Sequence, residues 1–159
     1  MYVEIICVGK LKEKYLRDAV QEYRKRLSRY CKVEIIEVKD EILPSCLSPG
    51  DMERVLKTEA ERIKKNIKEG SYIIALDING EQVSSGDLAE RIQALMLRGS
   101  SRLTFIIGGT LGLHSSLLET AHWRLSFSKM TFPHQLMRVF LCEQLYRGFT
   151  IMKHEPYHR

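Results

Sequence analysis

The C-terminal third of the chain, from Phe105 to Arg159, reads FIIGGTLGLHSSLLETAHWRLSFSKMTFPHQLMRVFLCEQLYRGFTIMKHEPYHR. It begins with an apolar run, predicted to be a strand, that ends in the Gly-Gly pair at 108–109. A second predicted strand near 124–127 leads into a loop rich in Ser, Thr and Pro, and a long apolar helix over 134–153 follows. The polar tail 157–159 ends the chain. Two loops at strand ends and a tail with a phenol, an imidazole and a guanidinium bring many hydrogen-bonding groups into one region.

The rest of the chain alternates between strand and helix patterns. Apolar residues at spacings of three and four indicate an amphipathic helix over 13–29, and the nearly all-apolar run 72–78 is typical of a strand covered on both faces. Strands are predicted over 2–8, 33–38, 72–78, 103–107 and 124–127, and helices over 13–29, 51–68, 85–98, 115–121 and 134–153. This alternation predicts an α/β fold with a mainly parallel sheet flanked by helices, in a single domain of residues 1–159.

Local signals set several of these boundaries. Asp51 and Ser85 are expected to cap the helices that they precede, and Gly70 is expected to end the first of them. Asn79 and Gly80 are expected to turn the chain after its third strand. The stretch 40–50, with two Pro and two Ser, is expected to be a loop that could cover a site.

Composition limits the class of protein. The chain has 159 residues, of which 44% are hydrophobic and 28% charged, as in ordinary globular domains. There is no apolar run of membrane-spanning length, and the N-terminus is too charged for a signal peptide, so we expect a cytoplasmic protein without a membrane partner. The four cysteines form no CxxC motif and no Cys/His cluster, which predicts reduced, structural thiols and no metal site.

Positive charge is concentrated in two parts of the chain. Residues 10–32 contain nine Lys or Arg and three Asp or Glu, a net charge of +6, and residues 124–159 have a net charge of +4. Since the whole chain carries +5, the remainder is acidic at −5. Two basic regions on an acidic body suggest a polyanionic partner, although a solvated helix face would give the same pattern.

Three strand ends are candidate ligand-binding positions, because open α/β sheets bind ligands beyond the carboxyl ends of their strands. They are 76–80, the glycines from 108 to 112, and 127–133. The glycine pattern is neither GxGxxG nor a Walker motif, so a tight turn and a nucleotide loop both remain open. His134, in the first turn of the last helix, could equally serve packing or capping.

The last helix is apolar on most sides, which indicates burial all round or a homodimer interface. Glu143 and Arg147 are four residues apart and are predicted to form a structural ion pair. Arg138 has no such partner in sequence and is the freer candidate for binding phosphate or substrate.

Five segments are distinctive together: VGKLKEKY at 8–15, ALDING at 75–80, IIGGTLGL at 106–113, LSFSKMTFPHQLMRVFLCEQLYR at 125–147 and PYHR at 156–159. They resemble the RlmH family, small SPOUT-class enzymes that methylate pseudouridine in 23S ribosomal RNA. The resemblance covers essentially the whole chain. The chain departs from the family pattern at Glu81, Leu111, Gly148 and His154.

The resemblance implies a C-terminal deep trefoil knot, S-adenosyl-L-methionine as methyl donor, and a homodimer that acts on N3 of a pseudouridine in assembled ribosomes. The implied donor-binding residues are Leu76, Gly108, Phe127, Ser128, Lys129, Met130, Thr131 and Phe132. The terminal Tyr157, His158 and Arg159 of one subunit would complete the site of the other.

We assign roles from the chemistry of methyl transfer, in which the acceptor N3–H must lose its proton. His158 is the first candidate for accepting that proton and His134 the second, while Arg159 would offset negative charge and Tyr157 would position the base. The expected RNA-backbone contacts are Lys10, Lys12, Arg17, Arg24 and Arg138. Two alternatives remain: a non-catalytic RNA- or ribosome-binding module, and a different nucleotide-using α/β enzyme.

Overall fold

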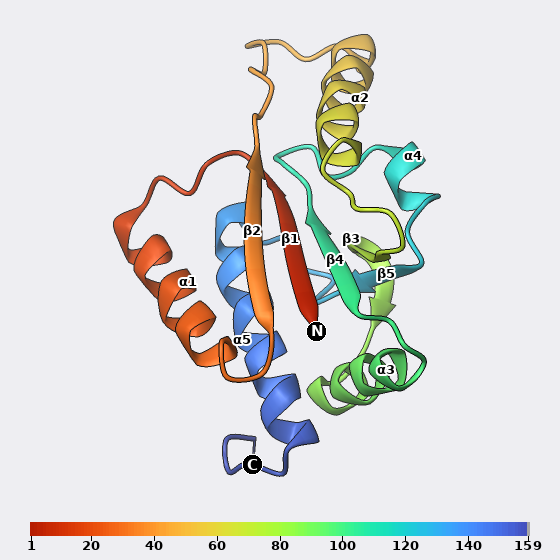
Figure 1. The fold of residues 1–159 in the computed structure, drawn as a ribbon. Coiled ribbons are helices and arrows are strands. Elements are labelled where there is room, and N and C mark those ends of the chain that lie inside the picture. Colours follow the sequence, from red (N-terminus) through yellow and green to blue (C-terminus); the bar gives the residue numbers. More distant parts are fainter. Residues whose placement is uncertain (159) are drawn as a thin grey trace.

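The computed structural model describes residues 1–158 and contains five strands and five helices in strict alternation (Figure 1). The strands are β1 (Tyr2–Val8), β2 (Lys32–Val38), β3 (Tyr72–Gln82), β4 (Arg102–Ile107) and β5 (Trp123–Ser126). The helices are α1 (Lys14–Leu27), α2 (Pro49–Lys64), α3 (Ser85–Leu97), α4 (Ser115–Leu118) and α5 (His134–Met152). All ten predicted elements are present.

The five strands form one sheet in the order β2-β1-β4-β3-β5, and every neighbouring pair is parallel. Parallel neighbours need crossover connections, and the helices supply them. The predicted fold class, a mainly parallel sheet flanked by helices, is confirmed. The threading of the C-terminal segment into a knot stays a prediction.

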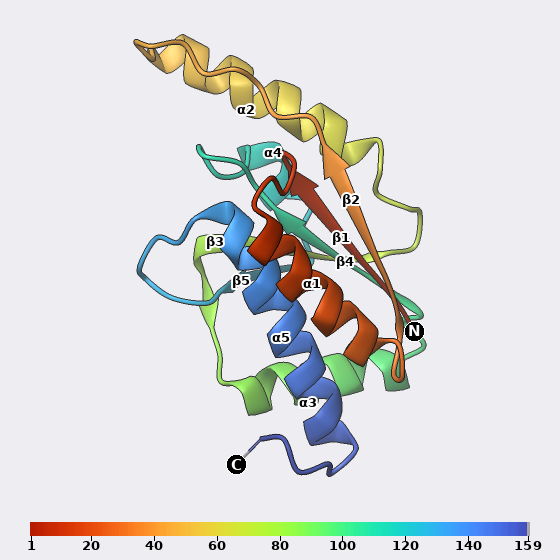
Figure 2. The ribbon, with the colours of Figure 1, turned by 90° about the vertical axis from the view of Figure 1, so that its left-hand side faces the viewer.

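Helices cover both faces of the sheet (Figures 1 and 2). Alternate residues of the central strands point to opposite faces, so Ile5 and Phe105 belong to the large core under α1, α3 and α5. Ile6 and Ile106 belong to the smaller core under α2 and α4. The alternation explains why the central strands are apolar along their whole length.

Helix α5 packs between α1 and α3 as well as against the sheet. Leu141, Cys142, Leu145 and Phe149 are buried there. The apolar composition of this helix is therefore largely explained by burial within one chain, and the alternative of a homodimer interface stays a prediction.

Two helices have their N-cap earlier than the sequence predicted, by three residues at α2 and by one at α3. The N-cap of α2 is Ser48, and Asp51 is the third helical residue, whose carboxylate completes a capping box. The same arrangement starts α3, where Ser84 rather than Ser85 is the N-cap. Helix α2 ends at Lys64, before the predicted end at 68.

The sequence predicted that Asn79 and Gly80 turn the chain after β3, but the chain stays in the sheet there. Leu76 and Glu81 both align with Leu125 of β5, so the residues between them bulge out and the strand then continues to Gln82. A Cβ on Gly80 would lie 2.7 Å from the Arg124 carbonyl, so the close return of the strand needs glycine there. The bulge is part of β3 and lies at its carboxyl end.

The four cysteines are free thiols, with Cys7, Cys31 and Cys142 buried and Cys46 exposed. Burial raises the pKa of Cys7 to about 12, which keeps this thiol protonated. Within residues 1–158, no helix is long and apolar enough to cross a membrane, and no group of three or more His, Cys, Asp or Glu side chains is placed to hold a metal ion.

Candidate functional site

The carboxyl ends of β4, β3 and β5 lie side by side in the sheet. Ala75 aligns with Ile106, and Leu76 aligns with Leu125. Gly108 follows Ile106 by two residues and Phe127 follows Leu125 by two, so both lie next to Leu76 at the same edge. The structure thus brings together the three strand ends that the sequence had singled out.

The loop after β4 is a tight turn built from three glycines. Gly112 has a φ of +85°, a conformation that favours glycine, and its N–H donates to the carbonyl of Gly109 over 3.1 Å. A Cβ on Gly108 would lie 2.4 Å from the Gly112 carbonyl oxygen. The turn therefore requires glycine at 108 because its own backbone leaves no room for a side chain. The sequence alone did not show this reason.

Replacing Gly108 by alanine should deform this turn, because the backbone at 108–112 must move to clear the new methyl group. The resemblance to the RlmH family implies that S-adenosylmethionine binds beside Gly108, so its affinity should fall at least about tenfold. Isothermal titration calorimetry measures the effect. Gly50→Ala is the matched control, because a Cβ there would meet nothing closer than 3.8 Å. Unchanged donor affinity in Gly108→Ala would remove the turn from the donor site.

The segment from Phe127 to Phe132 connects β5 to α5 and borders an apolar groove of about 390 Å³. The groove lies between this segment, the start of α3 and the middle of α5. Its apolar lining is Val83, Leu88, Leu125, Phe127, Phe132 and Phe140, and its polar rim includes Ser84, Ser85, Glu143 and Gln144. A volume of this size is in the range of pockets that hold small organic ligands.

Ser126 and Ser128 shape the loop by side-chain hydrogen bonds: Ser126 Oγ donates to the Ser128 carbonyl, and Ser128 Oγ accepts from the Met130 N–H. Met130 follows them with 71% of its surface exposed, although methionine is usually a buried residue. The loop thus has a fixed beginning and an apolar side chain presented to solvent.

A second, smaller cavity lies between α2, the loop after β2, the glycine turn and the start of α5. We call it the acidic pocket. Its volume is about 30 Å³, and its polar lining is Asp40, Glu41, Glu59, Thr110 and His134. Gly109 in its wall directly follows Gly108, and His134 lies two residues after Phe132, which lines the apolar groove.

Glu59 and His134 are the two titratable groups of the acidic pocket whose pKa values are shifted by their surroundings. Glu59 is only 5% exposed, and burial raises the pKa of its carboxyl group. The pKa of His134 is lowered, first by burial and second by the positive charge of Arg138, with Asp40 opposing both. His134 is therefore a neutral imidazole at neutral pH, the form that accepts a proton.

The raised pKa of Glu59 makes stability depend on pH in a defined direction. Because the folded state binds this proton more tightly than the unfolded state, the neutral carboxyl group contributes to the free energy of unfolding. This contribution is fully present below the pKa of Glu in the unfolded chain and is lost as pH rises through the pKa of the folded state. Glutamine does not titrate, so the melting temperature of Glu59→Gln minus that of the wild type should increase between pH 4 and pH 8. Calorimetric melts across this range check it, and a constant difference would contradict the raised pKa.

Arg138 lies in the interior, contrary to the hypothesis of a free phosphate-binding group. Its side chain is fully buried, its guanidinium pairs with Glu37 at 2.7 Å, and it donates to the carbonyls of Val8 and Gly9 at 3.1 and 2.7 Å. The helix face that carries it turns toward the ends of β1 and β2. We therefore do not retain Arg138 among the RNA-binding residues.

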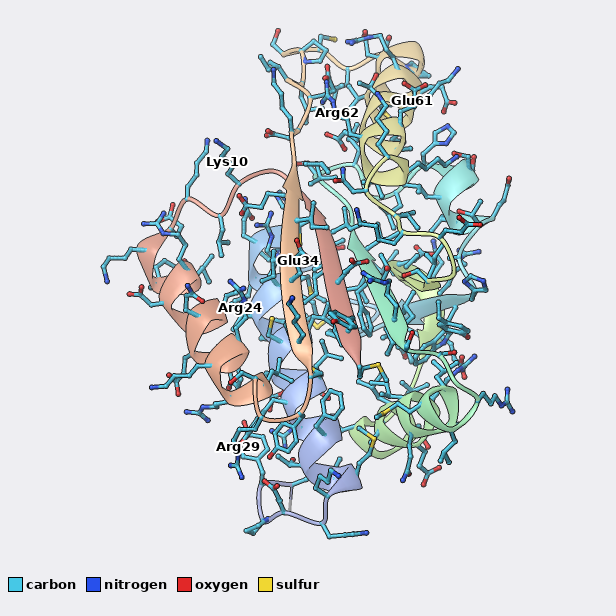
Figure 3. All side chains as sticks on the ribbon, viewed as in Figure 1. Lys10, Arg24, Arg29, Glu34, Glu61 and Arg62 are labelled. Carbon is cyan, nitrogen blue, oxygen red and sulfur yellow. The ribbon has the colours of Figure 1, made fainter. Side chains whose placement is uncertain are left out.

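The basic residues near the N-terminus differ in how free they are. Lys10, Lys12 and Arg17 are exposed, although Arg17 also donates to the carbonyls of Leu11 and Lys12. Arg24 is a residue of α1 whose side chain reaches β2 and donates to the Val33 carbonyl, while its Nε is buried without a partner among the described residues (Figure 3). Lys10 and Lys12 are therefore the freest cations of this group.

The terminal residues fold back onto α5 of their own chain. The Tyr157 ring packs edge-on against Tyr146 at 4.7 Å, and its hydroxyl donates to Glu143 over 3.2 Å. Glu143 forms the predicted ion pair with Arg147 at 2.5 Å, and Arg147 reaches His158 Nδ1 at 3.3 Å. Arg159 lies outside the described residues. The tail thus meets Glu143, a residue that also lines the apolar groove.

Burial is the main cause that raises the pKa of Tyr157 to about 12, followed by its hydrogen bond with Tyr23. The phenol therefore stays protonated at neutral pH and can position a ligand but cannot act as a base.

Glu81, one of the departures from the family pattern, has a structural use. Its carboxylate accepts from Trp123 Nε1 at 2.8 Å and pairs with Arg91 at 2.7 Å, while Arg91 lies 4.1 Å from the centre of the Trp123 ring. The acid therefore ties β5 to α3 next to the bulge of β3.

Sequence reasoning did not identify the acidic pocket. One signal was present: Val55, Glu59 and Ile63 recur at intervals of four, so Glu59 is a charged residue within the apolar stripe of α2. Acidic residues are almost never fully buried unless they are paired, and such an interruption of a stripe marks a candidate site.

Comparison with known proteins gives a consistent result. The family described as "Predicted SPOUT methyltransferase" matches residues 1–158. Curated relatives named Ribosomal RNA large subunit methyltransferase H, from Ruminiclostridium cellulolyticum, Acetivibrio thermocellus and Bifidobacterium animalis subsp. lactis, are 54%, 53% and 54% identical over 159 residues, covering 100% of each chain. Among solved structures, "a probable methylase family protein" from Haemophilus influenzae is similar in fold, with a TM-score of 0.53 at 12% identity over 99% of this chain and 70% of that one.

Proposed function

Because the chain belongs to the SPOUT methyltransferase family, we propose that it is an S-adenosylmethionine-dependent methyltransferase that modifies large-subunit ribosomal RNA. The observation that carries the proposal is similarity over the full chain, near 54% identity, to relatives named for that activity. The finer proposal is that it methylates N3 of a pseudouridine in 23S RNA, in the cytoplasm, on the assembled ribosome.

The residues at the edge of the sheet fit a methyl donor. The apolar groove beside Phe127 and Phe132 suits an adenine ring, and the glycine turn at 108–112 brings backbone groups close to a ligand. We therefore propose that Leu76, Gly108 and the run from Phe127 through Phe132 hold the donor. When bound, S-adenosylmethionine supplies an activated methyl group on a sulfonium, so the protein mainly has to align acceptor and donor.

The acceptor N3–H must lose its proton before or during methyl transfer. His134 is neutral and half-buried beside the donor loops, and His158 lies in the tail, so both remain candidate proton acceptors. We propose that Tyr157 and Arg159 position the base and offset negative charge on its carbonyl oxygens.

We further propose that the active form is a homodimer. Phe140 is 37% exposed at the edge of the apolar groove, and the tail contacts α5 through a few aromatic and polar side chains. An apolar helix surface and a terminal segment held at a few points are both suited to contact with a second copy, in which the tail would reach the partner's site.

RNA binding should depend on salt, because each phosphate contact releases counterions. For Lys10→Ala and Lys12→Ala, the slope of log affinity against log salt should fall by about 0.7–0.9 per lysine. Ribosome-binding titrations between 50 and 300 mM salt measure this slope, and Lys57→Ala, at an exposed position of α2, is the control. A slope equal to that of the wild type would exclude these lysines from the interface.

Nucleoside mass spectrometry of large-subunit RNA from a strain that lacks the protein tests the function. We expect N3-methylpseudouridine in the parent strain, its absence in the deletion strain, and an unmodified pseudouridine in its place. A modification unchanged by the deletion would contradict the proposal. A non-catalytic ribosome-binding module would leave the modification in place, and titration with S-adenosylmethionine, ATP and NAD would expose a different nucleotide-using enzyme.

A further inference from the structure

One of the two carboxylate oxygens of Glu59 accepts no hydrogen bond from the described residues. Oε1 accepts the backbone N–H of Glu41 over 3.0 Å, whereas Oε2 accepts no hydrogen bond from any described residue. Among residues 1–158, the side-chain polar atoms that are both inaccessible to solvent and without a hydrogen-bond partner are Arg24 Nε and Arg138 Nε. Glu59 Oε2 is not one of them, so it opens into the acidic pocket although the residue is only 5% exposed.

The direction of Oε2 is defined by the glycine turn. A Cβ on Gly109 would lie 3.1 Å from Glu59 Oε2 and 3.0 Å from a Val8 methyl group. The absence of a side chain at 109 therefore lets the carboxylate reach the wall that the donor turn forms. Glu59 thus lies between the loop after β2, which it holds through Glu41, and the turn that contains Gly108.

The size of the pocket limits what can enter. At about 30 Å³ it accommodates one or two water-sized groups and excludes a whole nucleobase. The edge of a base could enter while its ring stays outside, toward the donor loop that ends at Phe132. His134 lines the same pocket, so the entering edge would lie near a neutral imidazole.

We propose that the acidic pocket receives the N1–H edge of the acceptor pseudouridine and that Glu59 Oε2 accepts the hydrogen bond from N1–H. The proposal rests on the function proposed above and adds a specificity-determining residue. Pseudouridine is joined to ribose through carbon and keeps a free N1–H, whereas N1 of uridine carries the ribose. A carboxylate oxygen at this place therefore distinguishes the two bases at an atom that is not methylated.

The charges around Glu59 are consistent with this role. Asp40 and Glu41 from the loop after β2 oppose its ionisation, and Arg62 on α2 favours it while pairing with Glu41. His134 from α5 is neutral, and the glycine turn contributes no charged group to the pocket. No Lys or Arg among residues 1–158 forms an ion pair with Glu59, so an N–H donor from a ligand would satisfy an acceptor that these residues leave open.

Ribosomes that carry pseudouridine at the target, and ribosomes from a strain without the pseudouridine synthase that carry uridine there, test the proposal. Single-turnover methylation rates are measured on both with enzyme in excess. Wild-type protein should prefer pseudouridine, and Glu59→Gln should reduce that preference about 10- to 100-fold, because an amide N–H would face N1–H. Glu61→Gln, two residues along α2 and exposed, is the matched control and should keep the preference (Figure 3).

Glutamine keeps an acceptor for the Glu41 N–H, and thermal melts together with donor calorimetry establish that the variant is folded. Equal loss on both ribosomes in Glu59→Gln, or an unchanged preference, would overturn the proposal. So would wild-type protein that methylates both ribosomes equally, a result that does not depend on the variant. If wild-type protein methylates neither, the proposed function itself fails, and the two failures are thereby distinguished.

Discussion

Deleting Tyr157–Arg159 should abolish methyl transfer while leaving S-adenosylmethionine binding measurable by calorimetry. Tyr157 and His158 contact the middle of α5 through Tyr146, Glu143 and Arg147. None of these hydrogen bonds and ring contacts involves the glycine turn or the loop from Phe127 to Phe132. The donor loops are therefore complete without the tail. What the truncated protein loses is the phenol, the imidazole and the guanidinium that we propose to act on the acceptor base.

Single substitutions separate the parts of this effect. Tyr157→Phe keeps the ring packed on Tyr146 and loses only the hydroxyl with its hydrogen bonds to Glu143 and Tyr23, so its methylation rate should fall far less than that of the deletion. His158→Ala should shift the pH dependence of the rate if His158 accepts the proton. A deletion protein that methylates ribosomes at the wild-type rate would show that the tail has no role in the reaction.

Arg138→Met should be the most destabilising single substitution in this region. The side chain is fully buried, and its removal would leave the carbonyls of Val8 and Gly9 without this donor. The Glu37 carboxylate would keep its hydrogen bond from the Leu11 N–H but lose its cation. Glu37 is 36% exposed and can be solvated, so the cost falls mainly on the two carbonyls, and an unsatisfied buried acceptor typically costs about 1–3 kcal/mol. For a chain of this length, a total of roughly 2–6 kcal/mol corresponds to a fall in melting temperature of roughly 4–24 °C.

Arg26→Met is the control for Arg138→Met, because Arg26 pairs with Glu22 on the exposed face of α1 and its loss should change the melting temperature little. Differential scanning calorimetry of both variants measures the contrast. Similar melting temperatures for Arg138→Met and the wild type would mean that the buried pair does not hold the ends of β1 and β2 to α5.

Most of the fold was predictable because its signals are local or periodic. The alternation of strand and helix patterns is enough to predict a parallel sheet, and each of the ten predicted elements overlaps an observed one. The errors came from single positions. Asn79 and Gly80 are typical turn residues, yet pairing of Glu81 and Gln82 with β5 keeps the chain in the sheet, and no local pattern reports that partner.

The candidate donor site was predictable in outline for the same reason. Parallel strands end at one edge, so the loops after β3, β4 and β5 had to meet if those strands were neighbours. The role of Arg138 was not predictable, because α5 is apolar on most sides and its sequence does not show which side faces the ends of β1 and β2. The acidic pocket needs the loop after β2, α2 and the glycine turn to meet, and only the tertiary structure brings them together.

The most direct measurement of the central claim is methyl transfer in a purified system. Ribosomes from the deletion strain are incubated with the protein and S-adenosylmethionine carrying an isotopically labelled methyl group, and the large-subunit RNA is digested and analysed by mass spectrometry. The account predicts one labelled nucleoside, pseudouridine methylated at N3. Ribosomal RNA without label, from protein that is folded and binds the donor, would contradict it.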